Sequence, residues 1–329
     1  MKNNLISKIN INNVRKSSFH LIKDSLNSEI HSFTLNGRKA ILKIYKSEDE
    51  LRIKRETEVL KLLREKNFKN IPEILETNFD KKYIIMSFIK GKSPNYNKNF
   101  VERLAYYINN MQTYISHDDK KNLPFASEAA LSINEHFEKL FLKINYVKKK
   151  LKFFDEGKGI TKIIDNKILP WIDVYKNYLA KNYSNFCEKI DLEDMILSQS
   201  DIGLHNTFIY KNDLYTFDYE YAGIDDPSKT FCDLIIQPNM LFNNENFFSN
   251  LNALRKIEIF KDCYEKSLII LPLYRYKWYA IIINSFLKNK KSNESKSLLF
   301  LEKSKLYLKK TYNPINYIIN KKNIINLKI

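Results

Sequence analysis

The sequence contains very few cysteines. The only three in 329 residues, Cys187, Cys232 and Cys263, lie far apart. Their odd number and wide spacing match neither a disulfide framework nor the ligand spacing of a metal site. Sparse cysteine of this kind suits a protein that works in a reducing compartment. We therefore do not expect a small secreted domain held together by disulfides.

Long apolar runs are also missing. The longest ones, SLIILPLY and YAIIINSFL, are too short to span a bilayer. The opening stretch MKNNLISKININNVRK has no continuous apolar segment of the length that a signal peptide needs. The sequence therefore predicts a soluble cytoplasmic protein with no membrane span.

Negative charge is the minority sign, with 38 acidic residues against 55 Lys and Arg, for a formal net charge of +17. A charge of this size is compatible with nucleic-acid binding. However, the lysines are spread along the whole chain, with only short runs at 148–150 and 288–291. We therefore interpret the charge as solvated surface and predict no nucleic-acid partner. A hydrophobic fraction of 44% indicates a folded globule of one large domain or two.

The most informative stretch runs from Leu197 to Asp233, LSQSDIGLHNTFIYKNDLYTFDYEYAGIDDPSKTFCD. Asp201 is followed five residues later by Asn206, and Asp218 ends the next apolar run. The short β-branched and aromatic runs at 207–210 and 214–217, separated by Lys-Asn-Asp, predict a hairpin. A hairpin would bring Asp218 beside the loop that holds Asp201 and Asn206.

Two oxygen ligands from such a hairpin suit a hard cation such as Mg²⁺, which commonly takes one or two carboxylates together with phosphates and water. On this interpretation Asn206 and Asp218 hold the metal, and Asp201 is left to orient and deprotonate a substrate hydroxyl. The alternative is that all three are turn formers or strand-end caps, roles common for Asp and Asn.

The ordered pattern D-x4-N, apolar hairpin, FD-x-E-x-A-G, D-P and a later Asp resembles the aminoglycoside phosphotransferase and choline kinase family, distant relatives of protein kinases. The resemblance implies an α+β, protein-kinase-like two-lobed fold. It places a five-stranded antiparallel N-terminal lobe at residues 1–89 and a mostly helical C-terminal lobe at 90–329. It also implies ATP and Mg²⁺ as cofactors and a small-molecule hydroxyl acceptor.

The resemblance gives the same roles to Asp201, the catalytic aspartate, and to Asn206 and Asp218, the metal ligands. The family's usual continuation is matched by Glu220, Gly223, Asp226, Pro227 and Asp233. The departure lies upstream, where many members read His-Gly-Asp and this chain reads Gln199-Ser200-Asp201. That variant resembles members associated with surface-polysaccharide gene clusters.

Three strands are predicted before residue 46: SSFHLIKD at 17–24, SEIHSFTL at 28–35 and RKAILKIY at 38–45. Asn36-Gly37 is a strong hairpin signal between the last two. In the resembling family the loop at 25–28 covers the nucleotide phosphates, but here it contains no glycine.

Lys43 lies in the third strand, where the family's lysine contacts the α and β phosphates. A capping box at 47–50 predicts a helix that continues to about residue 66. Glu56 falls in the middle of that helix's apolar face, among Ile53, Val59, Leu60 and Leu63. A carboxylate there requires a cation, and Lys43 is the natural partner. The alternatives are an outward-facing Lys43 and a Glu56 that merely rims the core.

Two further strands are predicted at 73–79 and 83–88, with the boundary between the lobes near Lys90. The run YIIMSFIKG resembles the family's hinge, so Met86 is expected behind the adenine and the backbone from Ser87 to Ile89 at its edge. The alternative is a core strand that ends in a turn.

Helical spacing predicts segments at 100–116, 128–154, 170–189, 245–264 and 271–288, with a break at 157–159. The end of the chain, after Asn313, is either a last helix or a poorly packed tail. C-terminal helices wall the acceptor pocket in the resembling family. Tyr274, Arg275, Lys277 and Trp278 are therefore candidate acceptor contacts, together with Glu220 from the motif. The alternative for this aromatic stripe is a core face.

The sequence thus predicts an ATP-dependent small-molecule O-phosphotransferase whose acceptor is sugar-like or an amino alcohol, with a role in surface polysaccharide metabolism. The cationic Arg275 and Lys277 favour an acceptor that carries phosphate or carboxylate over a quaternary ammonium. A catalytically inactive, nucleotide-binding pseudokinase is the main alternative, and an RNA-binding protein is a third. No oligomeric state is predicted.

Overall fold

The computed structural model describes residues 18–25, 27–46, 50–94, 99–239, 244–290 and 294–321. They form two compact units. The first, called here the sheet unit, comprises residues up to 95 together with 110–127 and 197–224. The second, the helical unit, comprises 96–109, 128–196 and the residues from 225 onward. The sheet unit therefore combines the first part of the chain with two segments that are separated from it in sequence.

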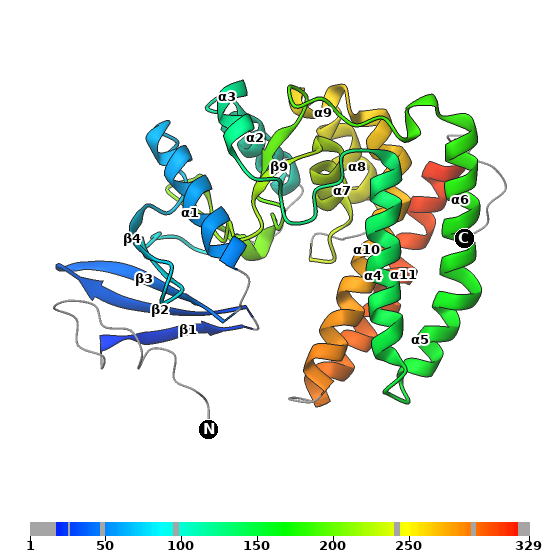
Figure 1. The fold of residues 1–329 in the computed structure, drawn as a ribbon, viewed down its shortest axis with the longest axis horizontal. Helices are drawn as coiled ribbons and strands as arrows, with labels where there is room; N and C mark the ends of the chain where they lie inside the picture. Colours follow the sequence, from blue (N-terminus) through cyan, green and yellow to red (C-terminus); the bar gives the residue numbers. More distant parts are fainter. Residues whose placement is uncertain are drawn as a thin grey trace. The chain divides into compact units, whose positions relative to one another are not determined.

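The sheet unit is built on five antiparallel strands in the order β1-β2-β3-β5-β4 (Figure 1). These are β1 (His20–Asp24), β2 (Ser28–Leu35), β3 (Arg38–Tyr45), β4 (Ile74–Asn78) and β5 (Tyr83–Ser87). All five predicted strands are confirmed. Asn36 and Gly37 have φ values of 49° and 75°, as a two-residue hairpin turn requires. Alternate side chains form a core on one face: Phe33, Ala40, Leu42, Ile44, Tyr83 and Ile85.

Helix α1 (Glu50–Glu65) packs against β4 and β5. The predicted capping box falls partly on residues 47–49, which lie outside the described residues. The predicted apolar face is confirmed, because Ile53, Val59, Leu60 and Leu63 are buried, and Glu56 is buried among them. The helix therefore carries an acidic side chain into the interior of the sheet unit.

The later segments of the sheet unit contain the predicted hairpin. Strands β7 (Thr207–Tyr210) and β8 (Asp213–Thr216) are antiparallel, with Thr207 opposite Thr216. The turn is one residue shorter than predicted, since Asp213 already pairs with Tyr210. The rings of Phe208 and Phe217 stack with centroids 4.6 Å apart across the hairpin. Short strands β6 (Ile196–Ser198) and β9 (Gly223–Asp225) pair with each other. The segment at 110–127 contributes helix α3 (His117–Asn122) to the sheet unit.

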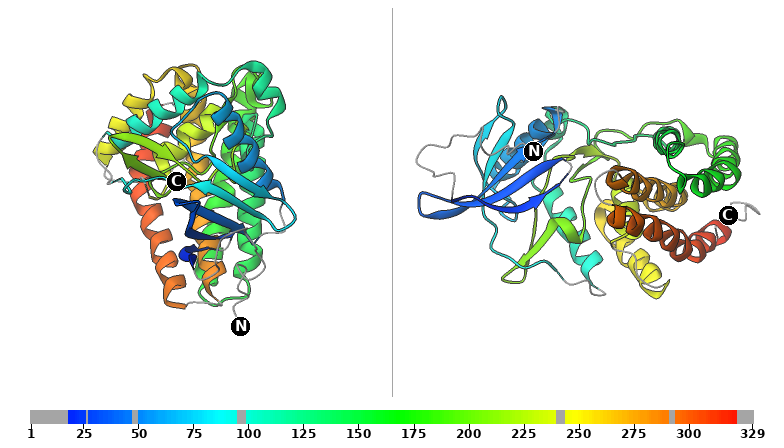
Figure 2. Two further views of the ribbon diagram at one scale, coloured as in Figure 1. Left: turned by 90° about the vertical axis from the view of Figure 1, so that its left-hand side faces the viewer. Right: turned by 90° about the horizontal axis from the view of Figure 1, so that it is seen from below.

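The helical unit is organised around α10 (Tyr264–Lys290), which packs against α4 (Ile133–Leu151), α7 (Pro227–Ile236) and α11 (Glu294–Lys321). Figures 1 and 2 show α10 and α11 side by side. A continuous helical path runs through α5 (Gly157–Ile163), a π-helical turn (Ile164–Ile168) and α6 (Leu169–Asn182). The remaining helices are α2 (Phe100–Gln112), α8 (Asn244–Leu254) and α9 (Glu258–Lys261). Within the described ranges, no helix combines the length and apolarity needed to cross a membrane.

Several predicted helix bounds were wrong. The segment at 128–154 becomes helical only at Ile133, because Ser132 accepts a hydrogen bond from the Glu135 N–H and caps the helix. The segment at 245–264 is two helices, α8 and α9. Helix α10 starts well before residue 271 and passes through Pro272. The chain after Asn313 remains helical to Lys321.

The predicted break at the two glycines was also wrong. Gly157 and Gly159 lie in the first turn of α5, and the break occurs just before them. A Cβ on Gly157 would stand 2.4 Å from the backbone oxygen of Leu151. Glycine is therefore required at 157 because α5 starts in direct backbone contact with the end of α4.

Candidate active site

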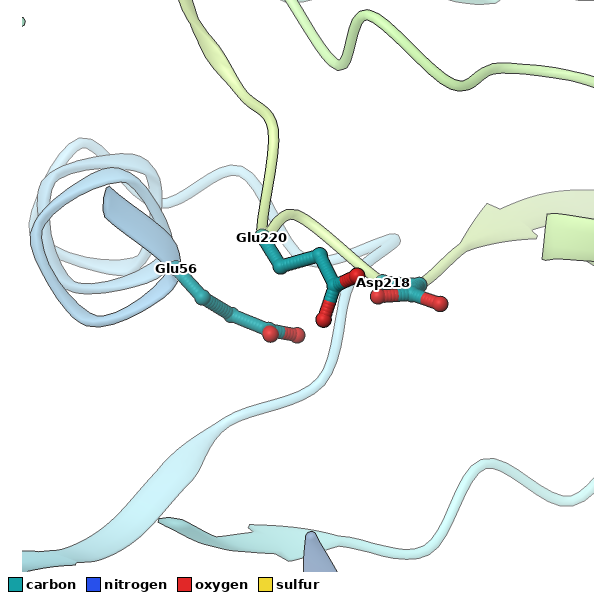
Figure 3. Close-up of side chains that lie close together, drawn as sticks. All are labelled: Glu56, Asp218 and Glu220. Carbon is teal, nitrogen blue, oxygen red and sulfur yellow. The ribbon is translucent and has the colours of Figure 1, made fainter. Parts of the chain in front are cut away.

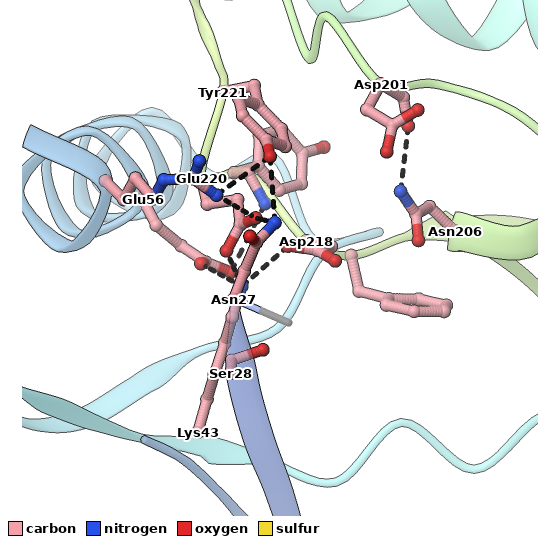
Figure 4. Close-up of polar contacts among 12 residues, drawn as sticks. Asn27, Ser28, Lys43, Glu56, Asp201, Asn206, Asp218, Glu220 and Tyr221 are labelled. Carbon is pink, nitrogen blue, oxygen red and sulfur yellow. Dashed lines mark hydrogen bonds and ion pairs between the residues drawn. The ribbon is translucent and has the colours of Figure 1, made fainter. Parts of the chain in front are cut away.

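The loop between β6 and β7 holds two of the predicted site residues. It ends in a 3-10 turn (Leu204–Asn206), and the Asn206 Nδ2 donates a hydrogen bond of 2.8 Å to the backbone oxygen of Asp201 (Figure 4). Asn206 is buried, and its Oδ1 has no hydrogen-bond partner among the described residues. The amide group is therefore fixed by its nitrogen, and its oxygen remains available as a ligand.

Asp201 carries its carboxylate at the accessible side of this loop, with the side chain 36% exposed. Its nearest side-chain partner is His205, whose Nε2 lies 3.2 Å from the Asp201 Oδ1. The Thr207 hydroxyl donates to the backbone oxygen of Gly203 at 2.7 Å and closes the turn. His205 therefore takes part in the loop's hydrogen bonding, and the Asp201 carboxylate is open to a reactant.

Asp218 follows β8 with a φ of 69°, a left-handed conformation that Asp tolerates better than most residues. The Gln199 Nε2 donates to the backbone oxygen of Phe217 at 2.5 Å and lies 3.3 Å from the backbone oxygen of Asp218. The Phe217 N–H donates to the backbone oxygen of Asn206 at 3.1 Å. Gln199, at the position where the resembling family has His, thus ties the Asp201 loop to the Asp218 turn. The predicted proximity of the two segments is confirmed.

Lys43 occupies the centre of the site. Its Nζ lies 2.6 Å from the Glu56 Oε2, 2.6 Å from the Asp218 Oδ1 and 3.3 Å from the Glu220 Oε2. The ion pair between Lys43 and Glu56 that the sequence predicts is present. Burial by itself lowers the pKa of Lys43. The negative charges of Asp218 and Glu56 outweigh this effect, so the net pKa stands well above its usual value. Burial likewise raises the pKa of Asp218, and Lys43 outweighs this and lowers it.

Glu56 is held from two further directions. The Tyr45 hydroxyl donates to its Oε2 at 2.5 Å, and the Tyr219 N–H donates to its Oε1 at 3.2 Å. Glu56 is fully buried, so these contacts replace the water that the carboxylate loses. The position of the Lys43 ammonium is therefore fixed by a carboxylate that is itself immobilised.

Glu220 was predicted to contact the acceptor, but the structure places it beside Lys43. Its Oε1 accepts hydrogen bonds from Arg52 at 2.9 Å and from the Asn27 amide at 3.1 Å. The Tyr221 hydroxyl accepts from the same two donors. A carboxylate two residues after Asp218 thus turns into the Lys43 cluster, where it meets two cations, and its contact with the acceptor stays a prediction.

The three carboxylates of Glu56, Asp218 and Glu220 lie with oxygens within 4.8 Å of one another (Figure 3). Lys43 contacts all three, and Arg52 contacts Glu220. Three negative charges and two positive ones leave one excess negative charge. The Lys43 ammonium group fills the centre of the cluster, which argues against a metal ion there.

The better donors for a divalent cation are oxygens that Lys43 does not contact. The remaining donors are the second oxygen of Asp218, whose side chain is 20% exposed, and the unpartnered Oδ1 of Asn206. Carboxylate and amide oxygens together form the type of ligand set that Mg²⁺ takes in proteins. The residues present therefore fit the predicted metal.

The predicted adenine contacts lie on and after β5. Met86 is buried and pairs with Ile41 and Ile74 in the neighbouring strands. The Ser87 N–H donates to the Glu73 oxygen at 2.8 Å, and the Ser87 Oγ accepts from the Glu73 N–H at 2.9 Å. The Ser87 N–H, expected at the adenine edge, is therefore already used within the sheet unit. Ile89 is half-buried.

In the helical unit, three of the four predicted acceptor residues on α10 belong to one buried polar group. The Trp278 Nε1 donates to Asp233 at 2.9 Å, and the Lys277 Nζ lies 3.6 Å from Asp233. The Tyr274 hydroxyl lies 3.1 Å from the His136 Nδ1.

Arg275 lies apart from this group. Its Nε donates to the Thr311 hydroxyl at 2.9 Å and its Nη2 to the Leu308 oxygen at 3.0 Å, both on α11. Arg275 therefore faces α11 and not the group formed by the other three, since successive residues of a helix point about 100° apart. The contact of these four residues with the acceptor stays a prediction.

Two contributors to the Lys43 cluster were missed from the sequence. Tyr45 lies two residues after Lys43 on β3, and Arg52 lies one turn before Glu56 on α1. Residues at i and i+4 share a helix face, so the position of Arg52 was a usable signal. Residues two positions apart on a strand share a face, so the position of Tyr45 was a usable signal as well.

Known proteins resemble this chain in structure and not in sequence. No protein-family model matches it, and no curated protein matches it. Among solved structures, the streptomycin–ATP ternary complex of an aminoglycoside phosphotransferase has a TM-score of 0.54 and 14% identity, covering 87% of this chain and 90% of the other.

Choline kinase from Cryptosporidium parvum has a TM-score of 0.57 and 15% identity over 94% of this chain and 95% of its own. An aminoglycoside phosphotransferase from Alicyclobacillus acidocaldarius has a TM-score of 0.59 and 9% identity over 97% and 99%. The chain therefore has the protein-kinase-like fold that the aminoglycoside phosphotransferases and choline kinases share, as the sequence resemblance implied.

Proposed function

We propose that this protein transfers the γ-phosphate of ATP to a hydroxyl group of a small molecule. The observation that carries the proposal is the Lys43 cluster. A buried lysine is fixed at 2.6 Å from both a helix carboxylate and the carboxylate that follows the β7–β8 hairpin. In kinases such a lysine and glutamate pair positions the nucleotide phosphates. The shared fold supports the same assignment.

In the proposed reaction Lys43 binds the α and β phosphates, and Glu56 holds its ammonium in place. Asn206 and Asp218 would hold Mg²⁺, which neutralises charge on the phosphates when bound. Asp201 orients the acceptor hydroxyl and takes its proton. The hydroxyl oxygen forms the new bond to the γ-phosphorus, the bond from that phosphorus to the bridging oxygen breaks, and ADP leaves with the electron pair.

The nucleotide base is assigned to the end of β5. Met86 packs behind the adenine, and the Ser87 carbonyl and the Ile89 backbone supply its edge contacts. The Ser87 N–H is excluded from this role because Glu73 already accepts its hydrogen bond. The three cysteines are all free, which supports the cytoplasm as the location.

For the acceptor, we propose a sugar-like alcohol, with a role in surface polysaccharide metabolism. The solved structures similar to this chain include a phosphotransferase in complex with streptomycin and a choline kinase. Lys277 stands 4.5 Å over the Tyr274 ring, so a cation already occupies the aromatic face that a quaternary ammonium would need. A neutral or anionic acceptor is therefore favoured over an amino alcohol.

The second candidate is a nucleotide-binding pseudokinase. Its support is the loop at 25–28, which has no glycine, and the replacement of the family's His by Gln199. Both candidates predict ATP binding, and only the first predicts turnover.

The discriminating experiment is release of ADP by the wild type and by Asp201→Asn, measured with a panel of sugars, sugar acids and amino alcohols. The proposal predicts acceptor-dependent ADP release that Asp201→Asn reduces by about 10²–10⁴-fold, with unchanged affinity for ATP. Equal rates in the two proteins would remove Asp201 as the base. ATP binding without turnover on any acceptor would favour the pseudokinase.

A further inference from the structure

A large pocket lies entirely within the helical unit. Its volume is about 900 Å³. One wall comes from α5, the π-helical turn and α6, and the other from α10 and α11. None of its lining residues belongs to the sheet unit that carries Lys43 and Asp201. The pocket is therefore made of different residues from those proposed for phosphotransfer.

The wall on α10 is formed by Arg275, a buried cation with no acidic partner. Arg275 is 4% exposed, and its guanidinium donates to the Thr311 hydroxyl, the Leu308 oxygen and, at 3.3 Å, the Tyr276 hydroxyl. In the part of the chain that the structure describes, no Asp or Glu lies within ion-pair distance of it. A buried charge without a counter-ion is unfavourable, so this environment favours an anion in the pocket.

The facing wall carries a hydrogen-bond donor that is not used. Trp171, on α6, is 5% exposed, and its Nε1 has no partner among the described residues. Buried indole N–H groups usually find an acceptor. Its ring lies 5.2 Å from that of Tyr276, and the Arg275 guanidinium lies 5.8 Å from the Tyr312 ring. The pocket therefore offers aromatic surface together with a donor and a cation.

The mouth of the pocket carries two further cations. Lys167, on the π-helical turn, and Lys309, on α11, are both exposed and both line it. No Asp or Glu is among the lining residues. Single π-helical turns inside helices are frequently found at functional sites, and here the turn contributes the exposed Lys167 and the buried Ile168 to the lining. The charge of the pocket is thus uniformly positive.

We propose that this pocket is a binding site for a small organic anion, a carboxylate, sulfonate or phosphate carried on a flat ring. The anionic group pairs with Arg275 and accepts a hydrogen bond from the Trp171 indole, and the ring stacks on the tyrosines. The site is independent of the phosphotransfer proposed above, because it shares no residue with it.

The test uses 8-anilinonaphthalene-1-sulfonate, an aromatic sulfonate, and its uncharged analogue N-phenyl-1-naphthylamine. The chain has two tryptophans, Trp171 and Trp278, so Trp278→Phe leaves Trp171 as the sole indole reporter. We expect the sulfonate to quench Trp171 and to show energy transfer from it, and the uncharged analogue to bind at least tenfold more weakly. Equal affinity of the two probes would overturn the proposal, since it would show apolar adsorption only.

Variants at the rim keep the test independent of folding. In the same background, Lys167→Ala with Lys309→Ala should weaken the sulfonate about fivefold at low salt, as two partly screened charges would. The matched control, Lys162→Ala with Lys310→Ala, removes two exposed lysines from α5 and α11 that do not line the pocket. Equal weakening in the two pairs would contradict the assignment.

Arg275→Gln, checked for retained helicity by circular dichroism, should abolish the Trp171 signal, and wild-type affinity in a folded variant would contradict the proposal. MgATP should not displace the probe. Displacement would place the probe in the nucleotide site and overturn the assignment, whether or not the phosphotransfer proposal holds.

Discussion

Replacing Lys43 with Met removes a cation that touches all of Glu56, Asp218 and Glu220. Met has nearly the length of Lys and no charge, so the packing of β3 is retained. Glu56 is fully buried, so water cannot replace the lost ammonium group. The carboxylates would then face one another across a buried space with Arg52 as the remaining counter-ion.

Removing one partner of a buried ion pair typically destabilises a protein by about 3–5 kcal/mol. We expect a loss in that range for Lys43→Met in urea unfolding at neutral pH. The pH dependence of stability should also change. Lys43 lowers the pKa of Asp218 in the fold and offsets part of the burial that raises the pKa of Glu56. Without Lys43 both carboxylates bind a proton more readily in the folded state, so the variant should gain stability relative to the wild type as the pH falls.

A second substitution tests whether charge is the cause. Glu56→Gln in the Lys43→Met protein removes the stranded negative charge. The amide oxygen of Gln can accept from the Tyr219 N–H, and its NH₂ group can donate to the Tyr45 hydroxyl. The double variant should therefore be more stable than Lys43→Met alone, with a coupling energy of at least about 1 kcal/mol. If the two losses simply added, or if Lys43→Met unfolded at the wild-type urea concentration, the electrostatic account of the cluster would be refuted.

Two further predictions concern the helical unit. Gly157→Ala should destabilise the protein by about 1–3 kcal/mol, since its Cβ would stand 2.4 Å from the backbone oxygen of Leu151. Gly159→Ala, whose Cβ would have nothing within 4 Å, should stabilise the protein by about 0.5–1 kcal/mol. Chemical unfolding of both variants checks this, and equal effects would contradict it. Burial lowers the pKa of His136 despite its contact with Asp226, so its stabilising effect is complete above the ordinary histidine pKa of about 6.5 and is lost as the pH falls below it. The melting temperature should therefore drop between pH 7.5 and 5 by less in His136→Gln than in the wild type, and parallel curves would contradict this.

The sheet unit could be predicted from the sequence because its signals are local. Asn36-Gly37 encodes a tight hairpin, and the position of Glu56 on an apolar helix face requires a nearby cation. The hairpin at 207–216 brings Asn206 and Asp218 together without any assumption about distant parts of the chain. These features depend on residues less than twenty positions apart.

Other features depend on contacts that local patterns do not encode. The inward turn of Glu220 depends on Arg52 and Asn27, which lie far away in sequence. The start of α5 at Gly157 depends on a backbone contact with Leu151. The separation of Arg275 from its neighbours on α10 depends on the packing of α11. In each case a tertiary contact decided a question that spacing along the chain left open.

The most direct test of the account is calorimetric titration of ATP into the wild type and into Asp218→Asn, each with and without Mg²⁺. Asp218 is also a partner of Lys43, so the substitution affects the Lys43 cluster as well as the metal ligand. Circular dichroism would check that the variant is folded. The account predicts binding that Mg²⁺ strengthens in the wild type, and loss of that metal dependence in the variant. ATP binding that is unaffected by both the metal and the substitution, or no binding at all to the folded wild type, would contradict it.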